Sequence, residues 1–125
     1  MSANFLDTFV LVEYLRGNAA AKPFLASDVA TTILNLCELA YWGLVHGEEK
    51  ATDRLFRSLE PAVLEIPTEI VQVAMRWRRE RRSEGRDLSY IDVIGYWVAR
   101  YHGMDFVTSA EFEGVEGAVI VPQRE

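Results

Sequence analysis

Residues 5–15 read FLDTFVLVEYL, two apolar runs separated by an acid and a hydroxyl. A short apolar run that meets polar residues abruptly is typical of a buried strand feeding a helix. We therefore expect Asp7 to lie at the carboxyl end of the first strand, which begins at Asn4. The residues that follow, Phe9–Tyr14, are predicted to form the first helix.

The same alternation continues along the chain, where short apolar runs are followed by longer segments with apolar residues at helical spacing. Further strands are predicted at residues 29–32, 62–66, 105–108 and 118–121, and further helices at residues 19–26, 34–46, 48–58, 67–84 and 88–102. Strands that alternate with helices imply parallel βαβ units. The predicted fold class is therefore α/β, with a central, mostly parallel sheet flanked by helices in three layers and ligands expected outside the carboxyl ends of the strands.

Length and composition limit the class of protein. A chain of 125 residues, half of them apolar, predicts a single domain over residues 1–125 with one core. The one cysteine, Cys37, cannot form an intrachain disulfide, and its apolar surroundings predict a buried, inert thiol. No apolar run in the sequence is long enough to span a bilayer. These features favour a cytoplasmic protein without a membrane segment.

Aromatic residues are concentrated on the predicted helices, where we expect them in the core or in a protein interface rather than in a platform for stacking bases. They are Trp42, Trp77, Tyr90, Tyr96, Trp97 and Tyr101. In the last predicted helix, Ile91, Ile94, Val98 and Tyr101 share the inward face. Neither histidine has metal-ligand spacing to another histidine or to the cysteine, which disfavours a zinc site.

Charge is segregated in a chain whose formal net charge is −6. Six arginines and two glutamates between residues 76 and 86 give that segment a charge of +4, so the remainder carries −10. On a helix, such arginines form either a solvated surface or a track for the phosphates of an RNA. The candidates for RNA contacts are Arg78, Arg79, Arg82 and Arg86.

Three acids lie in apolar surroundings where a solvated charge is out of place, namely Asp7, Glu38 and Asp92. Burying an unpaired carboxylate is costly or forces its protonation, so such acids are usually paired, capped or bound to a cation. Taken singly, Asp7 and Asp92 are each compatible with a structural role near the start of a helix. Taken together with Glu38, they indicate a functional site on one side of the predicted sheet.

Four segments, in this order, resemble the PIN domain family, and most closely the VapC-like toxins of prokaryotic toxin–antitoxin pairs. They are residues 5–15, 32–39, 88–96 and 106–115. The resemblance covers nearly the whole chain and implies a metal-dependent endoribonuclease, in which Asp7, Glu38 and Asp92 match the acidic triad around Mg²⁺ or Mn²⁺. The chemistry agrees, because hard divalent cations prefer oxygen ligands beside a phosphate.

The resemblance also places two hydroxyls, those of Thr8 and Thr108, beside the triad, where they would orient a carboxylate or a water; the alternative is that they are ordinary buried residues. Family members commonly carry a further aspartate two residues after the threonine of the last motif. That position is Ala110 here, or Ser109 when the motif is aligned from its other end. The nearest carboxylate is Glu111, either a substitute ligand or a solvated loop acid.

Partners also follow from the resemblance. It implies an RNA substrate, a homodimer, and a cognate antitoxin that inhibits by inserting a peptide near the acidic pocket. Antitoxin acids then become a further candidate partner for the arginines of residues 76–86. Because of Ala110, a PIN fold that has lost catalysis and binds RNA or a partner is the alternative function. A DNA nuclease is another, since the same acids serve both nucleic acids.

Overall fold

The computed structural model describes residues 3–124 and contains one four-stranded sheet. Its strands are β1 (Asn4–Leu6), β2 (Val29–Ala30), β3 (Asp105–Thr108) and β4 (Ala118–Ile120). They are ordered β2-β1-β3-β4, and each neighbouring pair is parallel. The β1–β3 pair joins segments that lie about a hundred residues apart in the sequence, whereas a short loop separates β3 from β4. The predicted parallel sheet is confirmed.

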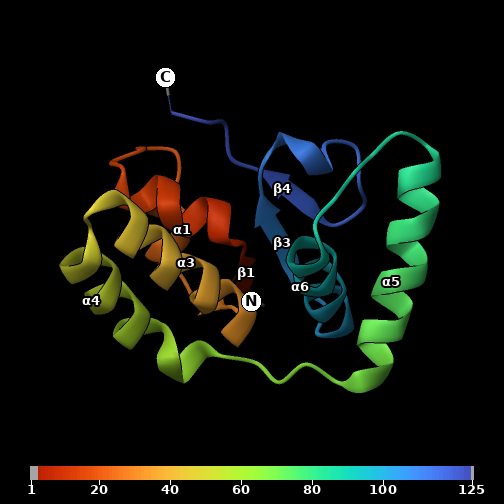
Figure 1. Ribbon diagram of the computed structural model, residues 1–125, viewed down its shortest axis with the longest axis horizontal. Helices are drawn as coiled ribbons and strands as arrows, with labels where there is room; N and C mark the ends of the chain where they lie inside the picture. The colour runs from red at the N-terminus through yellow and green to blue at the C-terminus, as the bar shows by residue number, and fades with distance from the viewer. Residues whose placement is uncertain (1–2, 125) are drawn as a thin grey trace.

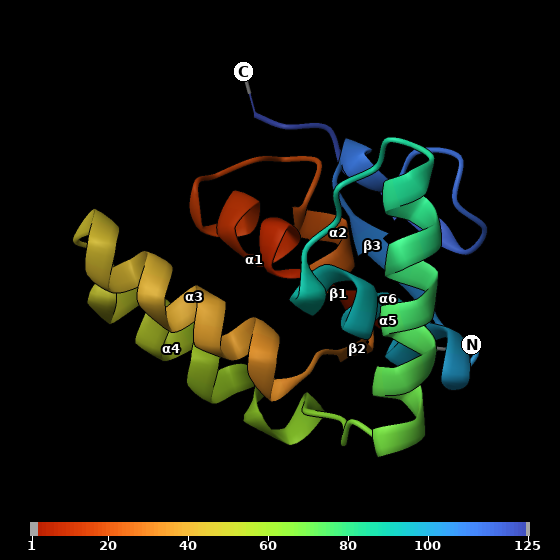
Figure 2. The same cartoon turned by 45° about the vertical axis from the view of Figure 1, so that its right-hand side comes forward.

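Helices cover both faces of this sheet (Figure 1). The α-helices are α1 (Thr8–Leu15), α2 (Lys22–Leu25), α3 (Ile33–His46), α4 (Glu49–Leu59), α5 (Thr68–Ser83) and α6 (Tyr90–Tyr101), and the 3₁₀ helices are η1 (Glu60–Ala62) and η2 (Ala110–Phe112). Figures 1 and 2 show α1, α3 and α4 on one side of the strands and α5 and α6 on the other. This arrangement confirms the predicted three-layer α/β fold.

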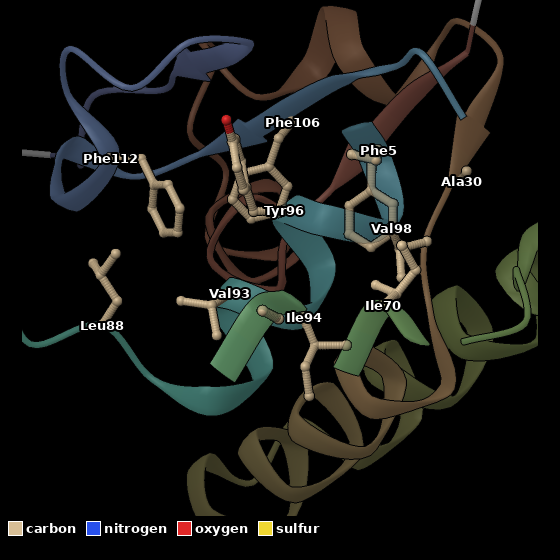
Figure 3. Close-up of a cluster of buried hydrophobic side chains, with 12 residues drawn as sticks. Phe5, Ala30, Ile70, Leu88, Val93, Ile94, Tyr96, Val98, Phe106 and Phe112 are labelled. Atoms are coloured by element: carbon tan, nitrogen blue, oxygen red, sulfur yellow. The ribbon is translucent and has the colours of Figure 1, made fainter. Parts of the chain in front are cut away.

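Side chains of the central strands alternate between two apolar cores, as the pleat requires. Phe5 of β1 and Phe106 of β3 point to the side of α5 and α6, and their rings lie 5.7 Å apart in a cluster that includes Tyr96 and Phe112 (Figure 3). Leu6 and Val107, one residue further along each strand, lie in the second core with α1, α3 and α4. The apolar strands are thus buried on both faces, so β1 and β3 are held rigidly at the centre.

Capping residues in the sequence lie at the ends of α3 and at the start of α6. Thr32 caps α3, its hydroxyl accepting the amide of Asn35, and Gly47 ends the helix in the left-handed conformation at φ 69°. Ser89 caps α6 in the same way, its hydroxyl accepting the amide of Asp92. These caps fix where both helices begin. Asp92 lies in the first turn of α6, and Glu38 lies in the second turn of α3.

Three predicted elements differ from the structure. Residues 62–66 do not form a strand: η1 occupies residues 60–62, and only Val63 makes an isolated bridge, to Thr31. The predicted helix over residues 19–26 contracts to α2, because Asn18 holds the preceding residues in a turn: its side-chain oxygen accepts the amide of Ala20 and its backbone carbonyl accepts that of Ala21. The strand predicted over 29–32 pairs with β1 only through Val29–Ala30; Thr31 turns to its bridge with Val63, and Thr32 already serves as the cap of α3.

Two predictions of burial are wrong. Cys37 is exposed, because it lies on the outer face of α3 together with Ile33 and Tyr41, which are 54% and 69% exposed. Tyr101 is 63% exposed: it is the last residue of α6, and its ring packs edge-on against His102 instead of the core. Within residues 3–124, no helix has the length and apolar character needed to cross a membrane.

Candidate active site

Asp7 occupies the junction between the central strand β1 and helix α1. Its amide donates to the carbonyl of Val107 at 3.0 Å, which extends the sheet by one residue, and its Oδ1 accepts the amide of Thr8 at 2.8 Å as the cap of α1. Its other oxygen, Oδ2, accepts the hydroxyl of Thr108 at 2.8 Å. With 3% exposure, this carboxyl is buried at the carboxyl ends of β1 and β3, the edge where ligands bind parallel sheets.

Asn35 is a fully buried site residue that the sequence analysis missed. Its side-chain amide donates to Asp7 Oδ1 at 3.3 Å and to Thr8 Oγ1 at 3.1 Å. Its side-chain oxygen, Oδ1, accepts a hydrogen bond from the hydroxyl of Thr32 at 2.7 Å, which fixes the orientation of the side-chain amide. A polar residue three positions before Glu38, in the first turn of an apolar helix, was the signal that could have identified it.

Glu38 lies one turn after Asn35 on α3 and reaches the same junction. Its Oε1 accepts the hydroxyl of Thr8 at 2.6 Å. Thr8 therefore links the acid of α3 to the segment that carries Asp7, across 30 positions of sequence. The carboxylate of Glu38 is partly exposed, so its remaining acceptor positions are available to a ligand.

Asp92 approaches from the opposite side, in the first turn of α6. A helix N-terminus favours a negative charge, yet burial, with the charges of Glu38 and Glu111, raises the pKa of Asp92 to about 6. Burial also raises the pKa of Asp7 well above its usual range, and the charge of Asp92 adds to that rise. The fold thus holds carboxyl groups near one another at a cost that a bound cation would relieve.

A pocket of about 430 Å³ opens onto these acids. Asp7, Glu38 and Asp92 line one end of it, with Ser109 and Glu111. The rest of the wall is largely aromatic and aliphatic, formed by Phe9, Val12, Tyr41, Trp42, Val45 and His46. The pocket therefore joins an acidic end to an apolar groove along α1 and α3.

The donor set of the acidic end consists of oxygens, which suits Mg²⁺ or Mn²⁺ and not a soft metal. Among residues 3–124, no three side chains of histidine, cysteine, aspartate or glutamate already enclose a metal position by themselves. Mg²⁺ usually keeps several waters and takes only one or two carboxylates with substrate phosphates. The residues present therefore fit a cation that is shared between the protein, water and a phosphate.

The structure brings together all six acidic and hydroxyl residues predicted for the site. Thr8 and Thr108 bond to acids of the predicted triad, and Glu111 lies on the pocket wall at η2. Ala110, at the position where an aspartate was expected, is exposed. Ser109 caps η2 by accepting the amide of Glu111, which fixes the path of this short segment past the acids.

The predicted arginine track lies elsewhere, and none of its four residues lines the acidic pocket. Arg78 donates to the carbonyl of Leu88 at 2.6 Å and lies over the ring of Tyr90, so it fastens the loop before α6. Arg86 donates to the carbonyl of Glu113 at 2.6 Å. The two remaining members of the track, Arg79 and Arg82, are exposed.

Known proteins share this architecture. The family model of the PIN domain matches residues 5–111. A chain of a toxin–antitoxin complex from Klebsiella pneumoniae superposes with a TM-score of 0.77 at 20% identity, over 97% of this chain and 99% of that one. VapC20 of Mycobacterium tuberculosis, a toxin that cleaves the sarcin–ricin loop, superposes with a TM-score of 0.63 at 21% identity, over 89% and 90% of the two chains. Curated proteins include no significant match.

At these identities the two solved structures establish a common fold. The family model goes further, because it matches the sequence itself from β1 to η2 and includes Asp7, Glu38 and Asp92 within its bounds. It thereby confirms the resemblance drawn from the four sequence segments. By sequence and by fold, the chain belongs to the PIN domain family.

Proposed function

We propose that this protein is a divalent-metal-dependent endoribonuclease and the toxin of a toxin–antitoxin pair. The observation that carries the proposal is the meeting of Asp7, Glu38 and Asp92 at one end of a pocket, with the pKa values of both aspartates raised. Buried acids held together against their mutual repulsion are typical of a site that binds a cation. A cytoplasmic location is part of the proposal, because the RNA of a prokaryotic cell lies in its cytoplasm.

In this proposal Asp7 and Asp92 hold Mg²⁺ or Mn²⁺, and Glu38 binds it directly or through a water. When bound, such a cation lowers the pKa of a water and stabilises the charge on the phosphoryl oxygens. The chain supplies orientation: Thr108 fixes Asp7, and Thr8 fixes Glu38. The hydrogen bond from Thr108 lowers the pKa of Asp7 against the effect of burial, and so favours the ionised form that binds a cation.

The apolar groove beside the acids supports a protein inhibitor. Tyr41 and Val45 are 69% and 59% exposed and border the acidic end. A peptide with apolar residues on this groove and an arginine at the acids would bury both surfaces and block the cation site. The similar chain from Klebsiella pneumoniae belongs to a toxin–antitoxin complex, so we assign this role to a cognate antitoxin. A homodimer through other helical surfaces is also part of the proposal.

The first experiment is cleavage of a mixed RNA pool by purified protein with Mg²⁺, Mn²⁺ or EDTA. We expect metal-dependent cleavage that Asp92→Asn abolishes. Arg57→Gln is the matched control, because Arg57 is an exposed residue of α4 that pairs only with Asp53. Metal-dependent RNA cleavage retained in both Asp92→Asn and Asp7→Asn would contradict the assignment. A parallel DNA pool tests the DNA nuclease directly.

A second candidate function is a PIN fold without catalysis that binds RNA or a partner. The observation that favours it is the exposed Ala110 where the family pattern has an aspartate. Titration with Mn²⁺ separates the two functions. A nuclease requires binding that Asp7→Asn weakens, whereas a fold that has lost its site binds the ion no differently after that substitution.

A further inference from the structure

A second cavity, of about 460 Å³, lies on the sheet face covered by α5 and α6. We call it the arginine cleft. It is lined by Trp77, Arg81, Arg86, Trp97, Arg100 and Glu116, among others, and none of these residues lines the acidic pocket. The cleft is comparable in volume to the acidic pocket and within the range of small-molecule sites.

The less exposed side chains of the arginine cleft are cationic or aromatic. The guanidinium of Arg81 lies 5.0 Å over the ring of Trp77, and its side chain is only 23% exposed. The acids that partner the arginines are the exposed members of each pair: Glu116, 3.6 Å from Arg100, has a side chain that is 86% exposed. Exposed ion pairs are weak. An incoming phosphate can therefore replace these glutamates at low cost.

Two residues that line the cleft each carry a buried nitrogen without a hydrogen-bond partner in the part of the chain that the structure describes. Within residues 3–124, the indole N–H of Trp97 is one of two buried side-chain nitrogens that lack a partner. The other, Nε of Arg81, lies 3.2 Å from Glu84 but without hydrogen-bond geometry. Both nitrogens are covered by the surrounding side chains, so a ligand in the cleft would contact the accessible parts of Trp97 and Arg81 and not these two atoms.

One chain segment contributes residues to both the cleft and the acidic pocket. Arg86, from the loop before α6, donates to the carbonyls of Glu111 and Glu113. Glu111 lines the acidic pocket, and residues 114–116, a few positions further along the same segment, line the cleft. The hydroxyl of Tyr96 donates to the carbonyl of Glu116 at 2.6 Å and holds this segment in place.

We propose that the arginine cleft binds a nucleotide of single-stranded RNA next to the segment cleaved at the acids. Bases of single-stranded RNA stack on aromatic rings and guanidinium planes, and its phosphates pair with arginines, which is the chemistry that the aromatic and arginine side chains of this cleft offer. The proposal rests on RNA as the substrate of the proposed function. It explains how a chain of net charge −6 retains a polyanion beside its acidic site.

Tryptophan fluorescence tests the proposal. The chain has three tryptophans, so Trp42→Phe leaves only Trp77 and Trp97, both in the cleft. In EDTA, which prevents cleavage, a single-stranded RNA 12-mer is titrated into this variant. We expect saturable quenching and an affinity that falls about 3- to 10-fold on adding Arg100→Gln or Trp97→Phe. Adding Arg57→Gln, the same loss of charge on α4, leaves the affinity unchanged.

Equal affinity in the Arg100→Gln and Arg57→Gln variants would overturn the proposal, and so would quenching by an oligoglutamate of equal charge that matches the quenching by RNA. The proposed nuclease can fail separately. Loss of binding in Arg100→Gln without any metal-dependent cleavage by the wild type leaves the cleft assigned and removes the nuclease. Cleavage that depends on Asp92, with RNA binding insensitive to the cleft, does the reverse. Where both hold, Arg100→Gln raises KM for the 12-mer and leaves kcat unchanged.

Discussion

The hydroxyl of Thr108 donates to Oδ2 of Asp7 at 2.8 Å, although the two residues lie 101 positions apart. They stand at the carboxyl ends of β3 and β1, the two strands at the centre of the sheet. Parallel pairing of these strands brings the acid and its orienting donor together. The pairing therefore links the stability of the sheet to the chemistry of the candidate site.

Thr108→Val is expected to lower metal-dependent cleavage about 10- to 100-fold, the usual effect of removing a group that orients a ligand. The isosteric substitution removes a hydrogen bond that lowers the pKa of Asp7, so the pKa of this acid rises further. The activity profile should accordingly shift to higher pH. Thr108→Ser is the matched control, since it keeps the hydroxyl. Equal activity of the valine and wild-type proteins would show that this bond does not matter.

Asn35→Leu is expected to reduce both stability and Mn²⁺ affinity. The side chain is fully buried and donates to Asp7 and Thr8 while accepting from Thr32. Its loss leaves buried partners unsatisfied at a cost of about 1–3 kcal/mol in the free energy of unfolding. Urea denaturation and calorimetric titration measure the two effects. An unchanged Mn²⁺ affinity in a folded variant would restrict Asn35 to a structural role.

The stability of the metal-free protein is expected to fall as pH rises from about 4 to about 6. The pKa of Asp92 is raised in the folded state, from 3.8 to about 6, so the folded protein holds this proton where the unfolded chain has lost it. The stabilisation is complete at low pH and is lost as the pH passes the folded pKa. Asp7, raised for related reasons, acts in the same direction.

Asp92→Asn should remove much of this dependence. In EDTA at pH 7 we expect the variant to melt above the wild type, because the repulsion between Asp92 and Asp7 is gone. Added Mn²⁺ should then raise the Tm of the wild type and have little effect on that of the variant. Thermal melts in EDTA across this pH range check the sign. A wild type that gains stability as pH rises would refute the cation-site interpretation of these acids.

Glu13→Ala is expected to destabilise the protein without altering the acidic pocket. Glu13 is 1% exposed and accepts from Asn18 at 2.9 Å, from Arg16 at 3.1 Å and from the amide of Arg124 at 2.7 Å. Removing it leaves buried donors unsatisfied, at about 2–4 kcal/mol, and frees the last residues of the described chain. Limited proteolysis and urea denaturation measure these effects, and residual activity per folded molecule should match the wild type.

Much of the fold was predictable, because local patterns and tertiary demands agree. The alternation of apolar strands and helices predicted the parallel sheet, and the helices predicted at residues 34–46 and 88–102 end within two residues of the ends of α3 and α6. The strand predicted over residues 62–66 is wrong because two local signals conflict there. Residues 62–66 alternate like a strand, yet Pro61 lies within η1 and only Val63 finds a partner.

The sequence by itself identified Asp7, Glu38 and Asp92 as candidate site residues, since a carboxylate in an apolar run is costly wherever the chain places it. It also determined the family, through four segments in order. The tertiary structure alone decided which helix faces are covered: α3 is apolar nearly all round, and only packing against α1 and α4 leaves Cys37 outside. It alone joined Asn35 to Asp7 and placed Trp77 of α5 against Trp97 of α6, because such contacts depend on how distant elements pack and not on spacing along the chain.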